Sequence, residues 1–323
     1  PDPARDGRTI TVAETLDAAV EQLETDLADQ PERQARLRYT LAETYHALGL
    51  PHKGLPLVES VHDYARDQGG PEHPDTIRAM STLASLYADA GQLEEGIAMG
   101  EEALQLARRL IDPENRQLFR SVNSLALVYN LAGRYDAAVE LAEEVLDLRR
   151  TALGEEHPDT LSALNNLAVL YHQAGRMDEA LTLGQEALAL CRKHLGEEHP
   201  DTLRATNNLA GSYYEAGRLD DAIRIQETLL PLLRKVQGKE HPQTLSAMKN
   251  LSVYYSKADR INEAIKLQEE LLPLRRKVLG PEHRGTIEAV ALLVGSYEAV
   301  GRTEEALKLM DEVVQLLKMP SEE

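Results

Sequence analysis

A four-residue motif recurs in a 42-residue register along this chain of 323 residues and is lost at Asn115. It reads His-Pro-Asp-Thr from His73, His157 and His199, then His-Pro-Gln-Thr from His241 and His-Arg-Gly-Thr from His283. A fixed period of this length is the signature of stacked repeats, in which each unit packs mainly against its neighbours. The register holds without insertion from residue 31 to the end, so we expect seven units with no linker between them.

Within a unit, the apolar residues follow the spacing of helices rather than the alternation of strands. In the fourth unit one apolar stripe covers residues 159–174 and a second covers about 177–194, with Gly175 between them. A glycine at this point is typical of a left-handed helix end. Residues 10–28 fit the register as a lone second helix. The sequence therefore predicts an all-α solenoid of helix-turn-helix units with fifteen helices.

Several positions carry the same kind of residue in every unit. A Tyr column, with a Leu four residues before each member, consists of Tyr45, Tyr87, Tyr129, Tyr171, Tyr213, Tyr255 and Tyr297. Small residues stand where the two helices of a unit should cross closely, at Gly54, Gly96, Ala138, Ala180, Ala222, Ala264 and Ala306. A turn glycine follows the first helix of every unit except the sixth, which has Asp259. We expect the Leu and Tyr columns to form the core between adjacent helices.

The combination Leu-Ala-x-x-Tyr, then Gly, then Ala five residues later resembles the tetratricopeptide repeat. The 42-residue length, with the Asn-Asn-Leu-Ala and Leu-Gly-x-x-His-Pro-Asp-Thr segments, is similar to its kinesin-light-chain subclass. The resemblance implies a right-handed superhelical solenoid, with a leader and half-repeat helix over residues 1–30. The seven units are then 31–72, 73–114, 115–156, 157–198, 199–240, 241–282 and 283–323. Residues 11–38 also resemble segments that open the repeat regions of bacterial Ser/Thr protein kinases, which implies a larger bacterial signalling protein.

Composition narrows the possible partners. Lys and Arg total 35 against 54 Asp and Glu, a formal charge of −19, which argues against nucleic acid and against an anionic membrane surface. No apolar run approaches the length of a membrane-spanning helix, and the single Cys191 fits a reducing compartment. We therefore expect a cytoplasmic protein. The chain opens with Pro1 rather than Met, and we expect it to be a piece of a longer protein.

The residue pattern offers little for catalysis or for a cofactor. An enzyme needs groups of unlike role that converge on one point, whereas residues repeated every 42 positions form parallel rows. The His row cannot converge on one zinc ion, because equivalent atoms of successive repeats lie about 8–10 Å or more apart. We expect the His-Pro-Asp-Thr motif to start a helix and Cys191 to be a packing residue. The prediction is a non-enzymatic chain with no metal and no cofactor.

The resemblance implies that extended peptides lie along a concave face lined by the first helices. Asn166, Asn208 and Asn250 form a row on that face, where Asn residues of O-linked-GlcNAc transferase repeats clamp a peptide backbone. An Asn amide has the donor and acceptor that a peptide bond requires. One position earlier, Asn123, Asn165 and Asn207 would widen the row. The alternative is that these amides bond a neighbouring helix or water.

A second row stands five residues before the packing Leu. It holds Arg36, Arg78, Arg120 and Arg204, with Ser or Glu in the other units. Such a row would select an acidic peptide through forked, charge-assisted hydrogen bonds. Intramolecular pairing with nearby carboxylates is the alternative. His172 and Tyr214 lie on the same face and are further candidates for peptide contact.

The hypothesis from sequence is a protein-interaction scaffold that binds an extended, acidic partner segment in its groove. The rival is a structural module that joins copies of itself through exposed solenoid ends. We expect the apolar residues near the C-terminus to pack within the last unit, but no following first helix covers part of the set, so this end is either truncated or stacks on another chain. The set is Leu307, Met310, Val313, Val314 and Leu317.

Overall fold

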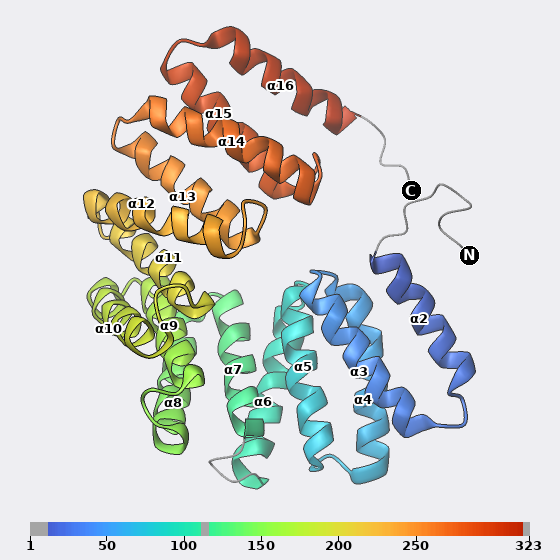
Figure 1. Cartoon of the computed structure of the whole chain (residues 1–323). Coiled ribbons are helices and arrows are strands. Elements are labelled where there is room, and N and C mark those ends of the chain that lie inside the picture. Colours follow the sequence, from blue (N-terminus) through green and yellow to red (C-terminus); the bar gives the residue numbers. More distant parts are fainter. Residues whose placement is uncertain (1–11, 111–115, 319–323) are drawn as a thin grey trace. The chain divides into compact units, whose positions relative to one another are not determined.

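The computed structural model describes residues 12–110 and 116–318, and every element in these ranges is a helix (Figure 1). The fifteen described helices comprise one single helix followed by seven helical hairpins, which confirms the predicted all-α repeat fold. The chain forms two compact units, unit 1 up to Glu155 and unit 2 from Glu156 onward. The boundary between them falls one residue from the end of the third repeat.

The hairpins follow the 42-residue register in both units. Unit 1 contains α2 (Val12–Asp26), α3 (Pro31–Ala47), α4 (Pro51–Gly69), α5 (Pro74–Asp89), α6 (Leu93–Leu110), α7 (Arg116–Leu131) and α8 (Tyr135–Leu153). Unit 2 contains α9 (Pro158–Gln173), α10 (Met177–Leu195), α11 (Pro200–Glu215), α12 (Leu219–Val236), α13 (Pro242–Lys257), α14 (Ile261–Leu279), α15 (Arg284–Ala299) and α16 (Thr303–Lys318). The helices expected in the fourth repeat are thus observed within one residue of their predicted ends.

The motif at the start of each first helix caps that helix. His157 precedes α9, and its Nδ1 accepts a hydrogen bond from the backbone N–H of Asp159 at 3.1 Å. The same bond is made by the histidines before α5, α11, α13 and α15. The Thr of the motif faces inward, as Thr244 Oγ1 donates to the carbonyl oxygen of Gly238 at 2.8 Å. The motif therefore starts one helix and ties it to the end of the preceding one.

The helices of a hairpin cross closely at the column of small residues. A Cβ on Gly96 would lie 2.9 Å from the carbonyl oxygen of Ala84, closer than real contacts allow. The turn before each second helix needs a positive φ, which is 74° at Gly175. Asp259 has a φ of 61° at the same position of the sixth repeat and is the only described residue other than glycine with a positive φ. Close helix packing thus accounts for the column of small residues, and turn geometry accounts for the column of turn glycines.

The Tyr column belongs to the core in three repeats and lies at its edge in the other four. Tyr45, Tyr213 and Tyr297 are buried, as predicted, whereas Tyr87, Tyr129, Tyr171 and Tyr255 are half-buried. The hydroxyls of Tyr87, Tyr129 and Tyr255 donate to carboxylates on the second helix of the preceding repeat, as Tyr255 does to Glu227 at 2.9 Å. Each of these three tyrosines therefore packs its ring inside and ties two repeats together through its hydroxyl.

Candidate functional site

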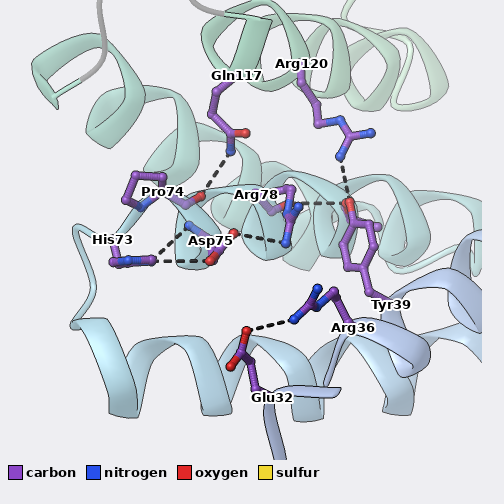
Figure 2. A network of polar contacts seen from close by, with 10 residues as sticks. Glu32, Arg36, Tyr39, His73, Pro74, Asp75, Arg78, Gln117 and Arg120 are labelled. Atoms are coloured by element: carbon purple, nitrogen blue, oxygen red, sulfur yellow. Dashed lines mark hydrogen bonds and ion pairs between the residues drawn. The ribbon is translucent and has the colours of Figure 1, made fainter. Parts of the chain in front are cut away.

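Three arginines of the predicted row lie in unit 1 on successive first helices. Arg78 of α5 and Arg120 of α7 both point at Tyr39 of α3 (Figure 2). The Arg78 guanidinium lies 4.9 Å from the centre of the Tyr39 ring, and Arg120 Nη1 donates to the Tyr39 hydroxyl at 2.7 Å. Thr82 Oγ1 lies 2.7 Å from the same hydroxyl. Side chains of three repeats are therefore held around one aromatic residue.

Tyr39 stays neutral in this setting. Its ring is buried, with 8% of the residue exposed. Burial raises the pKa of Tyr39, and this outweighs the hydrogen bond with Thr82 and the positive charges of Arg120 and Arg78, which lower it. The protonated hydroxyl can therefore accept from Arg120 and donate to Thr82 at once.

Each of the three arginines also meets a carboxylate. Arg36 pairs with Glu32 at 2.8 Å, and Arg78 pairs with Asp75 at 3.0 Å. The guanidinium of Arg120 reaches Glu43 at 3.4 Å. This is the intramolecular pairing that the sequence left open as an alternative. All three pairs are solvent-exposed, and such pairs contribute about 0–1 kcal/mol to stability.

A hollow of about 520 Å³ adjoins this cluster, bounded by α3, the end of α4 and the start of α5. Its polar lining includes Arg36, Tyr39, Tyr64, Gln68, His73 and Arg78. Figure 2 labels Arg36, Tyr39, His73 and Arg78 of this lining. The arrangement offers guanidinium groups and two aromatic rings to a side chain that enters from solvent.

The fourth arginine of the row, Arg204, belongs to unit 2. Its Nη2 donates to Asp201 at 2.7 Å and to Ser162 Oγ at 3.0 Å. Ser162 holds the same position of the row in the preceding repeat, so the row continues there as a contact between successive first helices. Arg204 is therefore paired in the same manner as the arginines of unit 1.

The asparagines of unit 2 form a two-layer network. Asn208 Nδ2 donates to Asn165 Oδ1 at 3.3 Å, and Asn250 Nδ2 donates to Asn207 Oδ1 at 3.4 Å. Gln226 of α12, which is fully buried, donates to Asn207 Oδ1 at 2.8 Å. Two amides of the predicted row, Asn208 and Asn250, are thus each oriented by a partner 43 residues earlier.

The remaining candidates lie in different surroundings. Asn165 is buried, with 4% exposed, which differs from the expectation that it widens an accessible row. Asn166 is exposed, whereas Asn123 and His172 are half-buried. Tyr214 is also half-buried, and its ring stacks on Tyr254 with centres 4.7 Å apart.

Sequence reasoning missed Tyr39 and the 43-residue offset of the polar contacts. Tyr39 and Thr82 occupy the repeat positions that Asn165 and Asn208 hold in unit 2. Both pairs make a side-chain contact between successive first helices. Comparing each position of one repeat with the position one residue further along in the next repeat would have revealed the pairing. The same two positions pair in both units, but the pair is Tyr–Thr in unit 1 and Asn–Asn in unit 2.

Other chemistry has no visible centre in the described part of the chain. No group of three or more His, Cys, Asp or Glu side chains within residues 12–110 and 116–318 is placed to hold a metal ion. Cys191 is buried, and burial raises the pKa of its thiol, the opposite of what a nucleophile requires. Of the helices described, none is long and apolar enough to cross a membrane.

These features define an array of helical hairpins whose first helices carry polar side chains in register. The tetratricopeptide repeat family model matches residues 33–109, 75–151, 117–193, 159–235, 201–277 and 255–319. The chain therefore belongs to the tetratricopeptide repeat family. A search of curated proteins gave no match.

Solved structures place the array near kinesin-light-chain-like repeats. A putative kinesin light chain from Podosopora anserina with nearly identical repeats is 29% identical, with a TM-score of 0.56, and the match covers 64% of this chain and 97% of that one. BtubC (BKLC) from P. vanneervenii is 23% identical, covering 78% and 93%, with a TM-score of 0.56. The quorum sensor NprR from B. thuringiensis shares the fold at 16% identity and a TM-score of 0.68, covering 94% and 83%. The chain is thus a kinesin-light-chain-like tetratricopeptide array.

Proposed function

We propose that this array is a non-enzymatic scaffold that binds an extended, acidic segment of a partner protein across its first helices. The observation that carries the proposal is the arginine cluster of unit 1, where Arg36 and Arg78 line a hollow and Arg120 is held beside it by Tyr39. Guanidinium groups presented in register suit carboxylates spaced along an extended chain. The resemblance of residues 11–38 to segments of bacterial Ser/Thr protein kinases supports the further proposal that this scaffold belongs to a larger bacterial signalling protein of the cytoplasm.

The carboxylates already present do not prevent this role. Arg36 and Glu32 keep 70% and 77% of their side chains exposed, so their attraction is strongly screened by water. A ligand carboxylate can replace such a partner at little cost, and a bidentate geometry would gain over the single contacts seen here. Tyr39 meanwhile holds Arg78 and Arg120 in place, which lowers the entropy cost of binding.

The asparagine row of unit 2 supports the same function. Asn165 and Asn207 orient Asn208 and Asn250, and a fixed amide loses less entropy when it bonds a peptide group. Such bonds do not read side chains and contribute about 0.5–1.5 kcal/mol each. Within unit 2, the row would therefore add affinity for a peptide backbone, and Arg204 would supply a preference for acidic residues.

Fluorescence anisotropy with a labelled (Glu-Ser)6 peptide tests the proposal, with (Gln-Ser)6 as the uncharged comparison. We expect the acidic peptide to bind more tightly, and Arg78→Gln with Arg120→Gln to weaken it about tenfold for each arginine lost. Arg224→Gln in unit 2 removes the same charge from an exposed site and is the matched control. Equal affinity for the two peptides, or equal loss in the control, would contradict the proposal.

Self-assembly through the C-terminal end is the second candidate. Leu307 and Met310 lie one turn apart on α16 and are 55% and 46% exposed. The side chains of Val313, Val314 and Leu317 lie outside the described residues. Sedimentation velocity over a range of concentrations would detect association, and Leu307→Glu with Met310→Glu should abolish it if this end joins copies.

A further inference from the structure

A buried glutamine of unit 2 occupies a position that most repeats fill with a small or apolar residue. Gln226 of α12 is 0% exposed. The first four repeats have Val58, Gly100, Ala142 and Gly184 at the same position. A buried amide costs stability unless its hydrogen bonds are made, so the contacts of Gln226 indicate what keeps it there.

The amide of Gln226 is fixed in one orientation by a backbone carbonyl. Its Nε2 donates to the carbonyl oxygen of Ala247 in α13 at 3.2 Å and to Asn207 Oδ1 in α11 at 2.8 Å. A backbone carbonyl can only accept, so a flipped amide would set two oxygens against each other. Both N–H groups of Gln226 are therefore in use, while its Oε1 is enclosed without a hydrogen-bond partner among the described residues.

This orientation passes from Gln226 to the asparagine row. Because Gln226 presents a donor, Asn207 must present its Oδ1, which has two lone pairs and also accepts from Asn250 Nδ2 at 3.4 Å. Asn250 is thereby held with its Nδ2 toward Asn207. Its Oδ1 makes no hydrogen bond within the described residues and is not among their enclosed polar atoms, so it is a free acceptor that reaches solvent.

The preceding repeat has the same pair of asparagines without this support. Asn208 Nδ2 donates to Asn165 Oδ1 at 3.3 Å, but Gly184 stands at the position of Gln226 and has no side chain to reach the pair. The Nδ2 of Asn165 is enclosed and has no partner in the part of the chain that the structure describes. Asn165 thus orients Asn208 but is not itself fixed by a third residue within that part.

The following repeat has the buried glutamine without its asparagine. Gln268 of α14 is 1% exposed, and neither its Nε2 nor its Oε1 has a hydrogen-bond partner among residues 12–110 and 116–318. The counterpart of Asn207 in this repeat is Lys249, which donates to Glu288 at 3.1 Å. Gln268 therefore matches Gln226 in type, position and burial, but it does not contact the asparagine row.

We propose that Gln226 is a positioning residue of the asparagine row: through Asn207 it fixes the Asn250 amide with its oxygen free, so that the sixth repeat accepts a backbone N–H of the partner segment. This inference rests on the proposed function, in which the segment lies across that row. A fixed acceptor attracts a peptide N–H and repels a peptide carbonyl, so it sets the register of the bound backbone. It also reduces the entropy that Asn250 loses on binding.

Two matched substitutions test the role of Gln226 in binding. Gln226→Met should weaken the labelled (Glu-Ser)6 peptide about three- to tenfold in fluorescence anisotropy, because Asn207 and Asn250 must then be ordered by the ligand. Gln268→Met removes the same amide one repeat later and should leave the affinity unchanged. Both variants should stay folded, since each removes an enclosed oxygen that has no partner among the described residues, and circular dichroism checks this.

A double-mutant cycle tests whether Gln226 acts through the row. Asn207→Ala removes the residue that connects Gln226 to Asn250 and should weaken the peptide by about the same factor as Gln226→Met. In an Asn250→Ala background, Gln226→Met should have no further effect, because the amide that it positions is absent. The same loss of affinity in both backgrounds would show that Gln226 acts on binding by another route.

Two ester analogues of the peptide test the donor that Asn250 accepts. In one, an ester oxygen replaces the N–H of every serine of (Glu-Ser)6, and in the other it replaces the N–H of every glutamate. One of the two should bind the wild type about three- to tenfold more weakly than the parent peptide, because a hydrogen bond to Asn250 is lost. Asn250→Ala should abolish that difference.

The side-chain amide of Asn250 can also be followed without any ligand. In a chain labelled with 15N-asparagine, its signal is assigned by its loss in Asn250→Ala, and nitrogen relaxation reports its mobility on the picosecond to nanosecond timescale. Gln226→Met should increase this mobility, and Gln268→Met should not. This measurement tests the positioning role even if the acidic peptide is the wrong partner.

Three results would overturn the inference. They are equal effects of Gln226→Met and Gln268→Met on affinity, unchanged affinity for both ester analogues, and an Asn250 amide as mobile in the wild type as in Gln226→Met. Failure of the wild type to bind (Glu-Ser)6 up to about 1 mM would instead contradict the proposed function and the N–H contact with it. The mobility of Asn250 would then decide the positioning role of Gln226 by itself.

Discussion

Two glycine-to-alanine substitutions should change stability in opposite directions. Gly96 lies in α6, where an added Cβ would sit 2.9 Å from the carbonyl oxygen of Ala84 and 3.3 Å from the amide nitrogen of Ala88. Gly211 lies in α11, where an added Cβ would meet no atom within 4 Å. Both residues are helical, so alanine gains about 0.5–1 kcal/mol of helix propensity at either site.

The contacts around each added methyl group decide whether the substitution stabilises or destabilises the protein. At Gly211 nothing opposes the propensity gain, so Gly211→Ala should stabilise unit 2 by about 0.5–1 kcal/mol. At Gly96 the methyl group meets backbone atoms, which cannot move without separating the two helices, and overpacking of this kind costs about 1–3 kcal/mol. The net expectation for Gly96→Ala is a loss of about 0.5–2 kcal/mol.

Urea unfolding monitored by circular dichroism measures both effects against the wild type. Because repeat arrays need not unfold in one step, the transitions should be fitted with nearest-neighbour coupling between repeats. A Gly96→Ala protein as stable as the wild type would show that α5 and α6 do not approach as closely as the contact at Ala84 requires. Destabilisation by Gly211→Ala would show that the space above α11 is filled.

Three further substitutions follow from single contacts. Burial raises the pKa of Glu288, but the hydrogen bonds and charges of Lys249 and Arg275 together outweigh it, so its pKa is lowered in the folded state. Ionised Glu288 therefore stabilises the fold at any pH above its pKa in the unfolded chain, and this stabilisation is lost as the pH falls through its pKa in the folded chain. In urea titrations, Glu288→Gln should lower the free energy of unfolding at neutral pH and reduce the amount of stability that acidification removes. Burial and the hydrogen bond to Glu227 raise the pKa of Tyr255 to about 12. The neutral Tyr255 should therefore stabilise the fold fully below about pH 10 and lose this effect above about pH 12. Ultraviolet titration of the wild type and of Tyr255→Phe would show the difference. Asp259→Gly should stabilise α13–α14 by about 0.5–1 kcal/mol in thermal unfolding, since the φ of 61° suits glycine better.

The repeat architecture could be predicted from sequence because it rests on local rules. The motif beginning at His157 places Pro158 in the first turn of a helix, and Gly175 ends that helix with a positive φ of 74°. Such signals act within a few residues and recur in most of the seven repeats, so the errors of single positions average out. The helix ends were therefore expected within one residue in the fourth repeat.

The roles of polar columns were harder to predict, because they depend on a neighbour 28 to 43 residues away. The row of Asn208 and Asn250 was found, but its bonds to Asn165 and Asn207 were only an alternative before the structure. Tyr39 was not recognised, although it organises Arg78 and Arg120. Which acceptor a side chain reaches depends on how far one helix is shifted along the next.

By itself, the sequence determined the helices, their turns, the period and the columns that pack, since each depends on backbone preference and apolar spacing within one unit. The tertiary structure decided which of the polar columns meet. It set Arg78 against the Tyr39 ring and brought Asn208 to Asn165. The physical reason is that hydrogen bonds and ion pairs act over about 3 Å, so a shift of a fraction of a helical turn between repeats changes the partner without changing the fold.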